Sequence, residues 1–216
     1  PEVTIPADVS VFSDGTFAVS DQGDSKVHLY SSDGVFLRSV ETAIAGETDG
    51  TPFGNAIGRD DTLWVALYTG RRPPSFGGVS RFTKSGEFLG HFLPGFTVSE
   101  LAVDPVDNTL WIPSPNGRLH HFNTEGVELG SFPTEAIPSL INGVAVAADQ
   151  TIYVTSSVRD VDSTPLLHYD RNGQLLDRFD IPSSILFISV QTVPEPSGAM
   201  LFCLLFGACA CRRVHL

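Results

Sequence analysis

A motif that occurs four times along the chain limits the possible folds more than any other property of the sequence. Each copy has an aspartate, a threonine two positions later, and then a short apolar stretch. The threonines recur every 42 to 47 residues. The four copies are Asp14–Val19, Asp60–Val65, Asp107–Ile112 and Asp149–Val154. A period of this length is typical of arrays in which one supersecondary unit repeats.

A second signature follows each copy of the first. It has an aromatic residue, a glycine four positions later, a leucine three after that, and an apolar residue three further on. The aromatic and glycine positions are Tyr30 and Gly34, Phe82 and Gly86, Phe122 and Gly126, and Tyr169 and Gly173. Apolar and polar residues alternate between the signatures, in short runs bounded by turn pairs such as Asp-Gly. This pattern predicts antiparallel strands joined by tight hairpins.

Four strands in roughly 40 to 50 residues match the size of one β-propeller blade. We therefore predict an all-β propeller over residues 1–192. Whole blades are predicted at 8–40, 55–92, 100–132 and 142–180, with part of another at 185–190. Because the sequence opens at Pro1, we expect a preceding N-terminal segment that supplies the missing strands and a signal peptide.

The stretch from Phe17 to Gly34 resembles an NHL-type repeat, and the wider set of repeats is similar to the NHL and gluconolactonase-like propellers. The resemblance covers about residues 8–180. Since propellers of this kind commonly have six blades, it implies that the chain is a fragment of a six-bladed propeller. It says little about activity, because propellers carry many unrelated functions.

The balance of charges argues against nucleic acid as a partner. The chain has 13 Lys and Arg against 25 Asp and Glu, a formal net charge of -12. Nucleic-acid binding relies on Lys and Arg that displace counterions from the polyanion, and an acidic body repels it. The acidity fits either solubility outside the cell or weak binding of divalent cations.

Polar residues stand at the entry to the four innermost strands, where they are expected to ring the mouth of a central channel. They are Asp8, Asn55, Glu100 and Asn142. The resemblance to gluconolactonase-like propellers implies that such oxygen ligands hold calcium, which can activate water. The alternative is that short polar side chains satisfy backbone groups at strand starts. No cofactor is predicted apart from this candidate calcium ion.

The other chemically interesting side chains follow the repeat. The histidines beside the recurring aromatic are His28, His120, His121 and His168. Repeat position explains them better than a metal cluster does. Trp64, Trp111 and Tyr153 recur at one strand position, which indicates packing between blades rather than a platform for sugars. The sequence has no Gly-rich phosphate loop, nucleophile elbow or HExxH motif.

The chain changes character from Val193, where Val-Pro-Glu-Pro-Ser precedes an apolar run from 198 to 211 and Arg212-Arg213. The prolines end sheet pairing and set off residues 193–216 as a separate element. The run is shorter than the roughly 20 residues that span a membrane as a helix. We predict an apolar helix that engages the membrane, with the arginines on the cytoplasmic side.

This tail resembles the PEP-CTERM sorting signal of exopolysaccharide-producing Gram-negative bacteria. Pro194, Glu195 and Pro196 match the motif, followed by the apolar run and the basic pair Arg212 and Arg213. The resemblance implies an exosortase-type processing enzyme as a partner, contact with the membrane, and delivery to the cell envelope, surface or exterior. The tail cysteines, which include Cys209 and Cys211, leave lipidation open as another fate.

Three functional hypotheses follow. The first is an exported binding or scaffold module, with extracellular polysaccharide or protein as its ligand. The second is a calcium-dependent gluconolactonase-like hydrolase or lyase, and the third is a matrix component without a small ligand. The observation that separates them is whether the oxygens of Asp8, Asn55, Glu100 and Asn142 converge.

Overall fold

The computed structural model describes residues 3–42, 50–68, 77–94, 96–135, 141–156, 163–182, 187–191, 201–205 and 212–213. These residues form strands and turns, without an α-helix among them. Consistent with this, the described part of the chain offers no helix that is long and apolar enough to cross a membrane. The chain divides into two compact units, residues 1–101 and 102–216.

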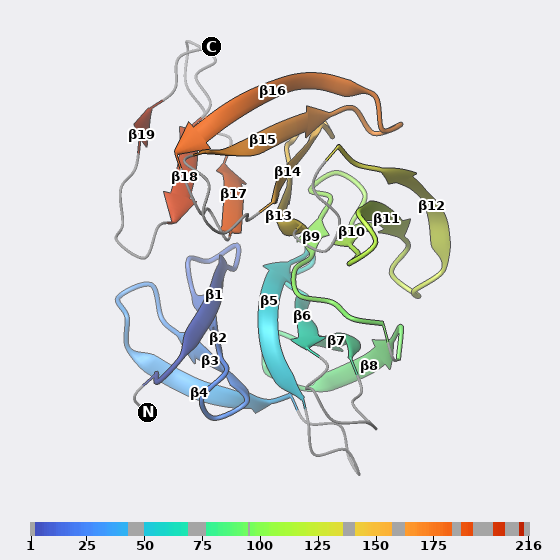
Figure 1. Cartoon of the computed structure of the whole chain (residues 1–216). Helices are drawn as coiled ribbons and strands as arrows, with labels where there is room; N and C mark the ends of the chain where they lie inside the picture. The colour runs from blue at the N-terminus through green and yellow to red at the C-terminus, as the bar shows by residue number, and fades with distance from the viewer. Residues whose placement is uncertain are drawn as a thin grey trace. The chain divides into compact units, whose positions relative to one another are not determined.

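The first unit contains two four-stranded antiparallel sheets, in which each strand pairs with the next in sequence (Figure 1). The first blade consists of β1 (Pro6–Val11), β2 (Phe17–Asp21), β3 (Lys26–Tyr30) and β4 (Phe36–Glu41). The second consists of β5 (Thr51–Ile57), β6 (Leu63–Tyr68), β7 (Gly78–Phe82) and β8 (Phe88–Phe92). The hairpin order predicted from the repeats is confirmed here.

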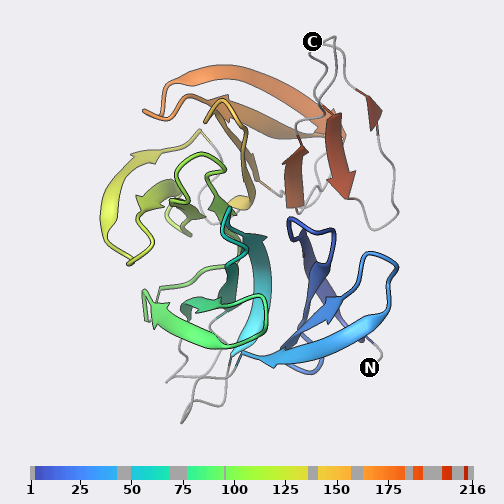
Figure 2. The same cartoon turned by 180° about the vertical axis from the view of Figure 1, so that it is seen from behind.

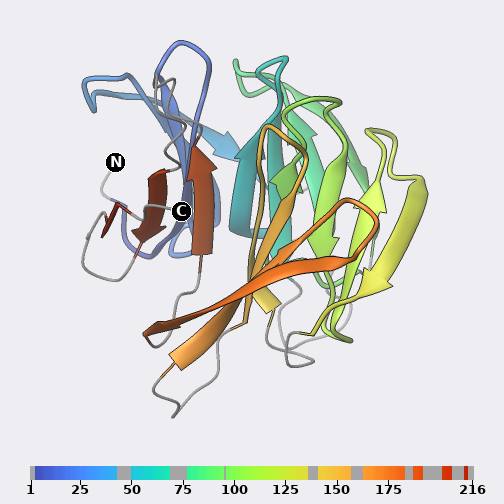
Figure 3. The same ribbon diagram turned by 90° about the horizontal axis from the view of Figure 1, so that it is seen from above.

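The second unit repeats the same plan (Figure 2). Its first blade consists of β9 (Ala102–Val103), β10 (Leu110–Pro113), β11 (Arg118–Phe122) and β12 (Glu128–Pro133). Its second consists of β13 (Ile141–Val146), β14 (Ile152–Ser156), β15 (Ser163–Tyr169) and β16 (Leu175–Pro182). Seen from above, β15 and β16 form a long paired ribbon (Figure 3). All four predicted blades are therefore present.

The C-terminal region differs from the sequence prediction. A further sheet of the second unit has the order β17 (Phe187–Gln191), β18 (Leu201–Leu205) and β19 (Arg212–Arg213). The predicted apolar helix is wrong for residues 201–205, which pair with β17 in register Phe187↔Leu205 to Gln191↔Leu201. An apolar run without a polar face can satisfy its backbone groups on an open strand edge, and β17 offers one. Pro194, Glu195 and Pro196 lie outside the described residues, so the domain boundary at 192/193 stays a prediction.

The first repeated motif is the turn between the first and second strands of every blade. In the first blade, Asp14 Oδ1 accepts hydrogen bonds from the Thr16 N–H at 3.0 Å and the Thr16 hydroxyl at 2.6 Å. The same aspartate-to-threonine backbone bond recurs in the other three blades. The residue between them has a positive φ in each case: Gly15 (85°), Asp61 (58°), Asn108 (64°) and Gln150 (66°). Glycine, aspartate and asparagine tolerate this conformation best, which explains the motif.

The second repeated motif marks the end of the third strand. In each blade the recurring aromatic sits at an irregularity in the pairing of the third and fourth strands. The glycine that follows has a φ between 79° and 87° and closes the turn: Gly34, Gly86, Gly126 and Gly173. A bulge of this kind bends a strand and increases its twist. The repeat therefore encodes the curvature of each sheet as well as its turns.

Each unit buries apolar residues from both of its blades. In the first unit, one core cluster joins Val27 and Leu29 of β3 with Leu63, Val65 and other residues of the second blade. In the second unit, an equivalent cluster joins β10 and β11 with β13 to β15. The recurring aromatics Trp64, Trp111 and Tyr153 are each only 2% exposed. Trp111 shares a core cluster with residues of β13 to β15, in line with the predicted packing between blades, whereas Tyr153 packs within its own blade. Their burial excludes a sugar platform.

Candidate cation site

Asp8 and Asn55 lie on β1 and β5, and the backbone N–H of Asn55 donates to Asp8 Oδ2 at 2.7 Å. The β1–β2 pairing is irregular between Pro6 and Asp8, and the β5–β6 pairing is irregular between Pro52 and Asn55. Bulges re-aim the side chains beside them. The two irregular strand starts thus bring the two predicted residues into direct contact.

The side chain of Asn55 is committed to neighbouring hydroxyl groups. Its Oδ1 accepts a hydrogen bond from Ser10 Oγ, and its Nδ2 donates to Ser20 Oγ at 2.9 Å. Asn55 is only 4% exposed. These contacts suit the alternative proposed from sequence, in which short polar residues satisfy groups at strand starts. Asn55 therefore acts first as a positioning residue for Asp8.

Glu100 is different, because one of its two carboxylate oxygens has no hydrogen-bond partner in the described part of the chain. The side chain is 5% exposed, and Oε1 accepts the backbone N–H of Leu101 at 3.0 Å. Oε2 is buried and accepts no hydrogen bond from the described residues. A buried, unsatisfied carboxylate oxygen costs about 1–3 kcal/mol or more unless something compensates it.

Gly54 makes room for Glu100, a role that the sequence did not reveal. A Cβ atom at position 54 would lie 2.6 Å from Glu100 Oε1 and 3.0 Å from the Glu100 Cα. The backbone N–H of Gly54 donates to the carbonyl of Ser99 at 3.1 Å, which fixes this approach. Only glycine fits such a contact without displacing Glu100.

The surroundings of Asp8 and Glu100 disfavour the charged form of both carboxylates. Burial raises the pKa of Asp8 to about 6, against the opposing hydrogen bonds from the Asn55 and Val9 backbone. Burial, and then the charge of Asp8, raise the pKa of Glu100 well above its ordinary range. Within the described part of the chain, neither carboxylate forms an ion pair. A proton or a cation must balance the pair near neutral pH.

The donor chemistry of this site fits a hard divalent cation. Carboxylate and amide oxygens are the ligands that Ca²⁺ prefers, and Glu100 Oε2 is available to one. Asp8, Asn55 and Glu100 all belong to the first unit. Asn142 is in β13 of the second unit and its side chain is outside the description, so its role stays a prediction. Arg212 and Arg213, predicted for sorting, form β19.

Comparison with solved structures places the fold in one class. Structures that share it over most of this chain are propeller enzymes and related proteins, at 15–17% sequence identity. Such low identity shows the fold alone, and the fold is a β-propeller. Neither a family model nor a curated protein matches the sequence.

Three of these structures illustrate the similarity in fold. A putative gluconolactonase has a TM-score of 0.68 at 17% identity, with 90% of this chain and 69% of that chain covered. The virginiamycin B lyase of Staphylococcus aureus with quinupristin has a TM-score of 0.67 at 17% identity, covering 94% and 64%. A streptogramin B lyase has a TM-score of 0.64 at 17% identity, covering 90% and 60%. This chain thus spans roughly three fifths of the length of the two lyases.

Proposed function

We propose that the chain is part of a propeller enzyme, a hydrolase or lyase that depends on a divalent cation. Asp8 and Glu100 would supply the anionic ligands, and Asn55 would position Asp8. The observation that carries this proposal is the buried Glu100 Oε2, which accepts no hydrogen bond from the described residues, together with the neighbouring charge of Asp8. The names of the similar solved structures, two lyases and a putative gluconolactonase, support this class over a plain binding module.

The residues of the chain prepare the site before any ligand arrives. The Asn55 N–H holds Asp8 Oδ2, while Ser10 and Ser20 hold the Asn55 side chain. The Leu101 N–H donates to Glu100 Oε1, while the buried Oε2 accepts no hydrogen bond from the described residues. A bound Ca²⁺ supplies Lewis-acid chemistry, in that it polarises a substrate carbonyl or lowers the pKa of a water molecule. An ester or lactone carbonyl is the matching substrate group.

Calcium should raise the thermal midpoint of the protein through ligand linkage. At a concentration of 100 Kd the gain is about 2.7 kcal/mol, or about 5–10 °C for a chain of this size. Glu100→Gln should abolish the rise, because it removes the charge that faces the ion. Asp104→Asn is the matched control, since Asp104 is an equally buried carboxylate that has protein partners. It should lower the midpoint but keep the calcium response.

The enzyme hypothesis has a separate readout in lactone hydrolysis. The protein with calcium should open an aldonolactone, and Glu100→Gln should not. A calcium response without any hydrolysis or elimination would leave a cation-binding module and favour the binding hypothesis. A midpoint indifferent to calcium would contradict the proposal outright.

We also propose that the protein is exported and sorted through its tail. This rests on the order of Pro194-Glu195-Pro196, the apolar run, and Arg212-Arg213 in the sequence. Because β18 pairs with β17, deletion of the whole tail would also disturb a sheet, so a point variant is cleaner. In a host with an exosortase-type enzyme, Glu195→Ala should retain unprocessed protein in the envelope, whereas wild type reaches the surface or medium. Identical fractionation of both proteins would contradict sorting by this motif.

A further inference from the structure

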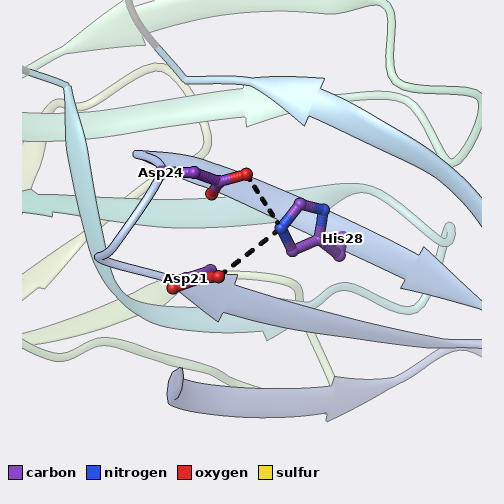
Figure 4. A group of neighbouring side chains, drawn as sticks. All are labelled: Asp21, Asp24 and His28. Atoms are coloured by element: carbon purple, nitrogen blue, oxygen red, sulfur yellow. Dashed lines mark ion pairs between the residues drawn. The ribbon is translucent and has the colours of Figure 1, made fainter. Parts of the chain in front are cut away.

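A second group of ligand-type side chains lies on the hairpin of β2 and β3 in the first unit (Figure 4). Asp21 ends β2, Asp24 is in the turn, and His28 is in the middle of β3. One nitrogen of His28 and one oxygen of each aspartate all lie within 4.8 Å of one another. Three potential ligands therefore converge within eight residues of sequence, away from Asp8 and Glu100 in the chain.

Asp21 is a fixed, buried carboxylate. Its Oδ1 accepts the backbone N–H groups of Ile5 and Gly23, both at 2.8 Å, and its Oδ2 accepts the N–H of Thr4 at 2.8 Å. Burial opposes ionisation, but these N–H groups together lower the pKa of Asp21 below its ordinary value. The carboxylate is thus held in the charged form, and its Oδ2 lies 3.7 Å from His28 Nε2.

His28 points its outer nitrogen at both aspartates. The ring is 1% exposed, and Nδ1 lies 2.9 Å from Ser39 Oγ. Nε2 is buried without a hydrogen-bond partner, 3.2 Å from Asp24 Oδ2 and 3.7 Å from Asp21 Oδ2. When Nδ1 donates its proton to Ser39, the lone pair of Nε2 faces two carboxylate oxygens. That arrangement is repulsive unless a metal ion, or a proton on Nε2, lies between them.

The two distances from the His28 nitrogen to the aspartate oxygens lie near those expected around a small transition-metal ion. Bonds of about 2.0–2.1 Å in tetrahedral geometry place the ligand atoms about 3.3–3.4 Å apart, and the two observed distances fall on either side of this value. Calcium takes six to eight oxygen ligands, whereas an imidazole with two carboxylates suits zinc. The side chain of Asp24 is 37% exposed, which leaves an entry path and room for a water ligand.

We propose that Asp21, Asp24 and His28 bind one Zn²⁺ ion, which links the two strands on either side of the β2–β3 turn. A comparison with the β9–β12 blade supports a site that is specific to Asp21, Asp24 and His28. There His120 occupies the register position of His28, but it pairs with a single carboxylate, Glu128, at 2.8 Å. The proposed site shares no ligand side chain with the Asp8 and Glu100 site, although Asp21 follows Ser20, which contacts Asn55.

The test uses the whole chain after treatment with a chelator. Calorimetric titration with ZnCl₂ should show one site, and Asp24→Asn should weaken it at least about tenfold, because it removes one charged ligand. Asp24 is partly exposed, so this variant should still fold. Glu128→Gln is the matched control, since it alters the one-carboxylate pair of His120 and should leave zinc affinity unchanged.

Cobalt provides a readout of the histidine ligand. Co²⁺ in place of zinc should give the visible absorption of a four-coordinate site, and His28→Gln should remove it. Three results would overturn the proposal: no zinc binding by folded wild type, equal affinity in Asp24→Asn, or loss of binding in Glu100→Gln rather than Asp24→Asn. The last would assign the zinc to the other site.

Discussion

Asp104 of the second unit and Glu100 of the first are both buried carboxylates, but they differ in how many protein groups compensate them. Asp104 in the second unit is fully buried; its Oδ1 accepts the Val106 N–H at 2.8 Å, and its Oδ2 accepts the Gln150 amide at 3.0 Å. Arg171 adds a cation 3.9 Å away. Glu100 in the first unit is 5% exposed and, among the described residues, accepts only the Leu101 N–H. Both carboxylates are buried, but Asp104 has several partners and Glu100 has few. We therefore interpret Asp104 as a structural carboxylate and Glu100 as a candidate ligand.

The largest effect on this comparison should come from Asp104→Ala. The change leaves the Gln150 amide and the Val106 N–H without their acceptor and removes the more distant charge partner of Arg171, which should lower the free energy of unfolding by about 2–4 kcal/mol. Urea denaturation of wild type and variant measures the difference. A loss below about 0.5 kcal/mol would mean that Asp104 is no better compensated than Glu100.

A smaller effect should appear in the pH dependence of stability without cations. The pKa of Asp8 is raised from 3.8 to about 6 in the folded protein, so the protonated form is favoured by folding. The stability that it contributes is complete below about pH 4 and is lost as the pH rises through 6. We expect wild type to lose about 1–2 kcal/mol relative to Asp8→Asn over this window, since Asp8 is partly open to solvent.

Thermal melts of both proteins at several pH values, with chelator present, measure this difference. Calcium should flatten the wild-type curve and leave the Asp8→Asn curve unchanged. If wild type instead gains stability relative to Asp8→Asn between pH 4 and 6, then Asp8 has a compensating partner and resembles Asp104.

The smallest effect should come from Arg171→Met. Arg171 is one-third exposed, forms an ion pair with Asp107, and lies farther from Asp104. Its loss should cost about 0.5–1 kcal/mol, and the cost should shrink in 1 M salt. Chemical denaturation at low and high salt tests both statements. A cost above 2 kcal/mol would make Arg171 the main partner of Asp104.

The fold was predictable because its information is local. Asp14 and Thr16 make their own turn, and Gly34 closes the next one, so the repeat reads directly as hairpins. The tail was not predictable in the same way. Leu201–Leu205 has no partner in its own stretch of sequence, and its conformation depends on the edge of β17.

The candidate sites were predictable only in part. Strand position indicated Asp8, Asn55 and Glu100, but the role of Gly54 depends on a contact between residues far apart in the chain. His28 was attributed to its repeat position, and Asp21 and Asp24 were not singled out. The sequence did contain a signal for Asp21, at the position five residues after the threonine of the turn motif. The first repeat has an aspartate there, whereas the others have Leu67, Ser114 and Ser156. A departure from the repeat was more informative than the repeat itself.

The aspartate-to-threonine turn has a consequence for the order of events in folding. Each of these turns joins residues two positions apart, so its closure costs little chain entropy and can occur as soon as the segment is synthesised. The contact of Asp8 with Asn55 spans 47 residues and must wait for the second blade. We therefore expect the four turns to form early and independently, and the Asp8–Glu100 site to appear only when the first unit closes.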